Sequence, residues 1–345
     1  MKINIKNIKV KSICATLFIF LFLSCNSGIE ELENKNNFFS SLANLRQDFL
    51  DVFTYFGDIV TDSLGIKAET KKDDIGGYFS KIESTMKNVQ DKLKNVAEKY
   101  GHYPKVKEKV AQFIEQLVKI EEGAKEASKV EEGAELLGNM EAKNSGGKPG
   151  EVDKLIKAIQ TIVNVVLAKG NPEAGNNLKA KDGQTPRANN NDSAGNLFAN
   201  NQAGTAHANA KEAATDAAKA VGAVTGADIL KAIVKEGGAA ATLAKNNTTH
   251  DSVNAVADAN DAVVAGAIAL RAMTKNGKFA GNTSAENAVA IVKNAAASAV
   301  NKTLSTLVIA IRNTVDTALK AISEALAAIK QGDMSADTSE SGNTK

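Results

Sequence analysis

Apolar residues recur at steps of three and four along most of the chain, and this spacing places them on one face of an α-helix. Three amphipathic helices are predicted near the start, over about 28–64, about 74–100 and from Pro104 onward. The apolar stripe of the first helix is Phe38, Leu42, Leu45, Phe49, Phe53, Phe56 and Val60. That of the second is Ile75, Phe79, Ile82, Met86, Val89, Leu93 and Val96. That of the third is Val106, Val110, Phe113, Leu117 and Ile120. Gly101 fits a helix end and Pro104 a first helical turn, so the three helices are typical of a bundle.

The pattern loosens after Glu121 and becomes rich in alanine. A fourth helix ending near Ala168 is predicted, with Leu155, Ile159, Ile162 and Val166 facing inward, and shorter helices are predicted over about 210–221, 227–236 and 251–275. The clearest later helix spans Ser284 to Lys330, where Thr283 and Glu286 have capping-box spacing. Its stripe is Leu304, Val308, Ile311, Val315, Ala318, Ile322, Leu326 and Ile329.

Residues 171–209 are predicted to be the least structured part of the chain. They contain ten asparagines and two prolines and almost no large apolar side chains, so they bury too little surface to offset the entropy of ordering. The polar tail 331–345 is predicted to be disordered. Alternating β-branched runs are nearly absent, so the fold class is all-α: an elongated helical bundle with long N- and C-terminal amphipathic helices, and shorter Ala-rich helices joined by Asn/Gly-rich loops.

The chain begins with features of a bacterial export signal. Four lysines precede an apolar run at 13–23, and eleven residues are too few to cross a bilayer as a helix. One cysteine, Cys14, lies in this run, and the other, Cys25, directly follows Ser24. A cleaved signal with nothing attached would leave Cys25 unexplained, because no second cysteine remains to pair with it.

The stretch Leu21-Phe22-Leu23-Ser24-Cys25 resembles the lipobox of bacterial lipoproteins, with Phe22 where the family usually has leucine. This resemblance implies that residues 1–24 are a lipoprotein signal peptide, cut between Ser24 and Cys25, and that Cys25 carries the lipid. Several acyl chains on one residue make a stable membrane anchor. The mature chain would then hold 38 Lys and Arg against 40 Asp and Glu, without the basic stripe of a nucleic-acid-binding protein.

Candidate catalytic chemistry is sparse. The histidines His102, His207 and His250 lie far apart in sequence and lack metal-ligand spacing. The acidic pairs Asp73-Asp74, Glu121-Glu122 and Glu131-Glu132 have lysines nearby, as solvated helix faces do. The chain has no phosphate-binding glycine loop and no nucleophile elbow. We therefore predict no catalytic, cofactor-binding or metal-binding residues, no cofactor and no enzymatic activity.

Three longer stretches resemble the variable large proteins of relapsing-fever Borrelia, which are related to the Vls surface antigens: "FLSCNSG", "NNFFSSLANLRQDFLDVFTYFGDIVTDSLGIKA" and "YPKVKEKV". The resemblance implies a surface-exposed, lipid-anchored antigen of the bacterial outer membrane that evades host antibodies by antigenic variation. It further implies one elongated helical domain over 25–330, with 28–125 and 284–330 as a helical stalk and 126–283 as a variable distal part.

Partners follow from this reading: the outer membrane through covalent lipid, and host antibodies, but no nucleic acid. Two alternatives belong to other functional classes. An adhesin would bind an unidentified host receptor through a pocket or patch, whereas an exported hydrolase would need a polar triad or a metal cluster. The strict seam from Ile75 to Val96 fits either packing within one bundle or a homodimer.

Overall fold

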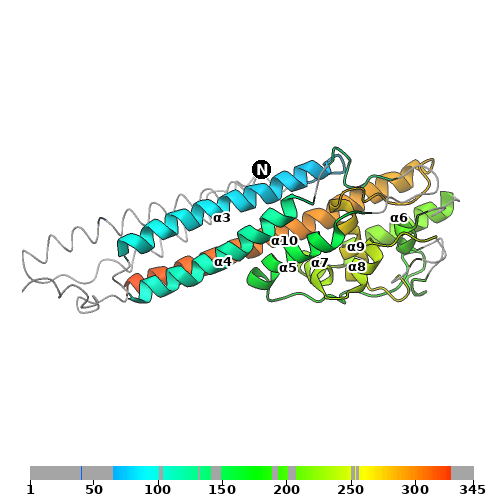
Figure 1. The fold of residues 1–345 in the computed structure, drawn as a ribbon. Coiled ribbons are helices and arrows are strands. Elements are labelled where there is room, and N and C mark those ends of the chain that lie inside the picture. The colour runs from blue at the N-terminus through cyan, green and yellow to red at the C-terminus, as the bar shows by residue number, and fades with distance from the viewer. Residues whose placement is uncertain are drawn as a thin grey trace, which may run out of the picture.

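The computed structural model describes residues 40, 65–100, 104–130, 133–140, 149–188, 193–200, 207–249, 253 and 256–327. Within these residues the chain forms helices and three isolated bridges but no strand, which confirms the all-α prediction (Figure 1). The elements are α3 (Lys72–Tyr100), α4 (Pro104–Ser128), α5 (Val152–Val166), η2 (Ala194–Phe198), α6 (His207–Ala223), α7 (Gly226–Val234), α8 (Ala239–Ala244), α9 (Asp261–Met273) and α10 (Glu286–Ala327). Apart from Ser40, the predicted helix over 28–64 lies outside the described residues, as do the signal peptide and the tail 331–345.

The helices α3 and α4 lie side by side along the length of the molecule, and α4 also contacts α10 (Figure 1). Their predicted seams are confirmed. Every stripe residue of α4 is buried, as are those of α3 from Ile75 to Leu93; the Val96 side chain is outside the description. The seam that also fitted a homodimer is therefore covered within a single chain.

The helices α5, α6, α7 and α8 and the short η2 form a group with α9 at its centre, at one end of the molecule (Figure 1). All thirteen residues of α9 are buried. The helix predicted over 251–275 begins later than expected, because residues 257–258 form a turn in which Asp258 takes a left-handed φ of 59° and Asn260 is the N-cap of α9. Small alanine side chains let its neighbours approach closely, and α5, α6, α7, α8 and α10 all contact it.

The last helix, α10, connects the two ends of the molecule. Its N-terminal half packs on α6, α7 and α9, and its C-terminal half reaches α4 (Figure 1). The predicted stripe is buried at Leu304, Val308, Ile311, Val315 and Ile322. The predicted capping box is wrong, because Glu286 is the first helical residue rather than the third. In the part of the chain that the structure describes, no helix combines the length and apolarity needed to span a membrane.

The prediction for 171–209 is wrong for most of that segment. Residues 171–188 are ordered by backbone hydrogen bonds such as Lys179 N to Thr185 O at 2.8 Å and Arg187 N to Asn177 O at 2.7 Å. All five residues of η2 are buried. Leu197 and Phe198 of η2 are buried in the apolar core, whereas residues 171–188 have few large apolar side chains and are held by a set of buried charges, as described below.

Candidate functional site

The predicted lipid-attachment residue Cys25 and the cleavage position Ser24 lie outside the described residues. His102 and His250 do too, and His207 opens α6 without a described side chain. Across the described ranges, no group of three or more His, Cys, Asp or Glu residues could hold a metal ion.

The acidic pairs that sequence analysis singled out have structural partners. Asp73 accepts a hydrogen bond from the Gly133 backbone N–H at 2.5 Å, and Glu121 accepts one from Gln90 Nε2 at 2.5 Å. Each bond links two segments of the α3–α4 region. Residues 131–132 lie outside the described part. These carboxylates therefore join structural elements and do not face one another across a cleft.

A cluster of four charged residues lies where α6 and α9 meet residues 171–188, and we call it the charge cluster; its members are Arg187, Asp216, Lys219 and Asp261. Arg187, Asp216 and Asp261 are fully buried. Arg187 binds Asp216 through Nε and Nη2, each at 2.9 Å, and its Nη2 also donates to Asp261 at 2.7 Å. Lys219 Nζ lies 2.9 and 3.0 Å from the two carboxylate oxygens of Asp261. The two positive and two negative charges balance.

The charge cluster also organises the backbone around it. Asp216 accepts hydrogen bonds from the N–H groups of Ala180 at 3.1 Å and Ala194 at 2.9 Å. Burial by itself would lower the pKa of Arg187, but hydrogen bonds and charge from Asp216, and then from Asp261, outweigh burial and raise it. Fully hydrogen-bonded buried charges fix one geometry. The cluster therefore holds a polar segment that has little apolar surface to bury.

An exposed loop, residues 181–186, directly precedes Arg187 and projects from this cluster. Asp182 shapes it by accepting from Thr185 Oγ1 at 2.6 Å and from the N–H groups of Thr185 and Gln184. These bonds, led by the Thr185 hydroxyl, lower the pKa of Asp182 to about 2. Gly183 takes a left-handed φ of 67°, which suits glycine. The loop is thus ordered although every residue in it is exposed.

A second buried arginine, Arg271, lies near the end of α9. Its guanidinium donates to the carbonyls of Ala244 at 3.0 Å, Asn246 at 2.5 Å and Lys278 at 3.2 Å, and lies 5.1 Å from the centre of the Phe198 ring. Burial lowers its pKa to about 9, so it is charged at neutral pH. The chain has only four arginines, and two of them are fully buried. The burial of these two arginines was not predicted from the sequence. The available signal was the rarity of arginine in a lysine-rich chain.

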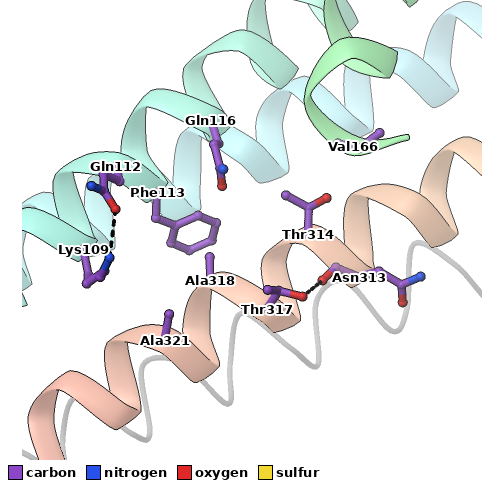
Figure 2. Close-up of a pocket in the computed structure, with 10 residues that line it drawn as sticks. All are labelled: Lys109, Gln112, Phe113, Gln116, Val166, Asn313, Thr314, Thr317, Ala318 and Ala321. Carbon is purple, nitrogen blue, oxygen red and sulfur yellow. Dashed lines mark hydrogen bonds between the residues drawn. The ribbon is translucent and has the colours of Figure 1, made fainter. Parts of the chain in front are cut away.

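The candidate binding surface is an open groove of about 430 Å³ between α4, α10 and the end of α5 (Figure 2). The lining residues are Lys109, Gln112, Phe113, Gln116, Val166, Asn313, Thr314, Thr317, Ala318 and Ala321. They include amides, hydroxyls and one ammonium but no histidine, carboxylate or cysteine. Four of the polar groups donate to residues of their own helix: Lys109 to Gln112 at 3.3 Å, Gln112 to Glu108 at 3.0 Å, Thr314 to the Ala310 carbonyl at 3.0 Å and Thr317 to the Asn313 carbonyl at 2.7 Å. The lining thus holds no histidine or carboxylate beside its threonine hydroxyls, which donate to backbone carbonyls of their own helix.

Known proteins resemble the chain over nearly its whole length. A sequence profile described as Borrelia lipoprotein matches residues 49–326. Variable large protein 4 of Borrelia hermsii is 42% identical over 95% of this chain and 96% of its own length. Variable large protein 17 of the same organism is 46% identical over 95% of each chain.

A solved structure is similar as well. The crystal structure of the Lyme disease variable surface antigen VlsE of Borrelia burgdorferi superposes with a TM-score of 0.67 at 29% identity, and the match covers 84% of this chain and 99% of that one. The chain therefore belongs to the Borrelia lipoprotein family, among its variable large proteins.

Proposed function

We propose that this protein is a lipid-anchored antigen of the bacterial outer surface, and that it mediates immune evasion by antigenic variation. The observation that carries the proposal is the similarity to variable large proteins over about 95% of the chain at 42–46% identity. The partners would be the outer membrane, through lipid on Cys25, and host antibodies. Epitope replacement, rather than a chemical reaction, would be the mechanism.

The distribution of structure supports this mechanism. The described interior is closed by alanine-rich helices and fully bonded buried charges, while the 181–186 loop is ordered and exposed. Exposed substitutions away from special geometry usually change stability by less than about 0.5 kcal/mol. The scaffold can therefore accept new surface residues without refolding, as epitope replacement requires.

The anchor is tested with the only two cysteines in the chain. Cys25→Ala should abolish incorporation of labelled palmitate and surface display, measured by protease digestion of intact cells. Cys14→Ala is the matched control, because it leaves the acceptor thiol in place, and it should label like the wild type. Palmitate labelling of Cys25→Ala at the wild-type level would show that the anchor is elsewhere.

Immune evasion is tested with two Borrelia strains that are isogenic except for the gene expressed, one carrying this protein and one carrying a variable large protein relative. Antiserum against this protein should clear the first strain from an infected host and leave the second to grow. The expected reason is that exposed epitopes differ while the scaffold is shared. Equal clearance of both strains would contradict antigenic variation as the mechanism.

The adhesin alternative stays a prediction. The described structure presents the polar groove of Figure 2, and none of its residues identifies a host ligand.

A further inference from the structure

Four backbone carbonyl oxygens converge on one buried ammonium group at the end of α9. Lys72 Nζ lies 3.2 Å from the oxygen of Arg271, 2.6 Å from Ala272, 2.8 Å from Thr274 and 3.1 Å from Gly277. The last carbonyls of a helix lack intrahelical donors and carry the negative end of the helix dipole. The four oxygens therefore form a site for a positive charge, which we call the carbonyl cage.

The ammonium enters the cage from a different helix. Lys72 is the first residue of α3 and is 0% exposed. Its backbone N–H donates to the Glu135 carbonyl at 2.9 Å, and the N–H of Asp73 donates to the Gly133 carbonyl at 3.2 Å. These bonds fix the first turn of α3, from which the Lys72 side chain reaches the end of α9. The cage thus connects α3 with α9 through a single buried cation.

We propose that the carbonyl cage is a binding site for a compact monovalent cation, and that the Lys72 ammonium is its tethered occupant. A cation supplied from solution would fill the cage once the lysine side chain is removed. The cation would restore the charge at the end of α9 but not the covalent link to α3. The ligand class is a small primary ammonium ion or a potassium ion.

The geometry selects this class of ligand. The four oxygens lie 2.6–3.2 Å from the nitrogen, within the range of N–H···O hydrogen bonds. Carbonyl oxygens also replace the hydration shell of potassium in channel filters. Magnesium is a poor fit, because it demands near-ideal octahedral geometry and keeps several waters. Choline is too bulky for a closed site and has no N–H to donate.

Other lysines in the described chain provide a comparison, because they also bond the carbonyls that follow helices. Lys302 Nζ lies 2.7 Å from the Val221 oxygen and 2.8 Å from the Val224 oxygen. Lys302 is only half-buried, so water can reach those carbonyls when the side chain is removed. Lys72 is 0% exposed, so water reaches the carbonyls of the cage less easily when that side chain is removed. We therefore expect an added cation to stabilise the Lys72 variant and not the Lys302 variant.

The test measures thermal unfolding of the full chain in the chlorides of methylammonium, ammonium, potassium, sodium and choline at one ionic strength. Lys72→Ala should melt several degrees below the wild type in choline. Its melting temperature should rise with the logarithm of methylammonium concentration, as stabilisation by a ligand of the native state requires. The wild type should have one melting temperature in all five salts, and Lys302→Ala should likewise show no dependence of its own melting temperature on the salt.

Lys72→Met is the matched variant that keeps the apolar stem and leaves no room for a cation. It should be destabilised and should not respond to methylammonium. Equal melting temperatures of Lys72→Ala in choline and methylammonium would overturn the proposal. If Lys72→Ala fails to fold in choline, the yield of folded protein on refolding in methylammonium becomes the readout, and failure in both salts would also overturn it.

Discussion

Replacing Arg187 with methionine removes the central cation of the charge cluster while keeping an unbranched apolar side chain in place of the arginine stem. Arg187 makes five hydrogen bonds, three to the carboxylates of Asp216 and Asp261 and two to backbone carbonyls. Removing one partner of a buried ion pair typically costs about 3–5 kcal/mol, because the other charge stays buried. Lys219 still neutralises Asp261, so Asp216 is the charge left unpaired. We therefore expect a loss in the lower half of that range.

Urea unfolding followed by circular dichroism at 222 nm measures this loss, and hydrogen exchange over 176–194 locates it. Lys181→Met is the matched control, because Lys181 is six residues away, is itself exposed and forms a partly exposed ion pair with Glu212 at 3.1 Å. Exposed pairs contribute less than about 1 kcal/mol. The control should thus unfold close to the wild type, with unchanged exchange at the amides of Ala180 and Ala194.

A double substitution separates charge from packing. Adding Asp216→Asn to Arg187→Met removes the unpaired carboxylate and should recover part of the lost stability, whereas Asp216→Asn alone should destabilise. The reasoning is refuted if Arg187→Met unfolds within about 1 kcal/mol of the wild type and its exchange over 176–194 is unchanged. In that case apolar packing, and not the charge cluster, orders the segment.

Four further outcomes are expected. Gly123→Ala should destabilise by about 1–3 kcal/mol in urea unfolding, because the added Cβ would lie 2.6 Å from Ile162 Cγ1. Gly77 is also inside a helix, but no atom would lie within 4 Å of an added Cβ, so Gly77→Ala should stabilise the fold by up to about 1 kcal/mol. If Gly77→Ala were less stable than Gly123→Ala, the packing around these two glycines would be contradicted. Asp182 should titrate with a pKa of about 2 by carboxyl ¹³C NMR, so the bonds it accepts in the loop are kept down to about that pH; a value near 3.8 would disprove these bonds. Burial raises the pKa of Asp316, so its ionisation destabilises the fold at neutral pH. Asp316→Asn should therefore raise the free energy of unfolding at pH 7 by less than about 1 kcal/mol. This gain should vanish below about pH 3.8, where the carboxyl group is protonated in the folded and the unfolded chain. A gain that persists at pH 3 would contradict this assignment.

The helices could be predicted wherever one face alone is buried. The α3 and α4 seams have strict steps of three and four because each helix keeps a solvated side, and Pro104 marks the start of α4. The α10 helix was predicted within three residues at each end for the same reason. Periodicity loses its information in α9, where Asp261 and Arg271 are buried along with the apolar residues.

The segment 171–209 could not be read from its composition. The order of residues 171–188 depends on pairing Arg187 with Asp216 and Asp261, which lie 29 and 74 residues further along the chain. Each of these residues by itself looks like an ordinary surface charge. Because three-dimensional proximity decides the pairing, no spacing rule within one sequence reveals it. The carbonyl cage around Lys72 is hidden for the same reason, since its acceptors are backbone atoms.

The position of the buried charges determines which surface changes the proposed function can use. Loop 181–186 is exposed, and its neighbour Arg187 is buried in the charge cluster. A substitution at an unconstrained exposed position usually costs less than about 0.5 kcal/mol, while losing Arg187 is expected to cost several times more. Tolerance therefore changes sharply between adjacent residues. An antigen that replaces its epitopes does not need a flexible surface. An ordered loop next to a buried charge cluster can change its side chains and keep its backbone conformation.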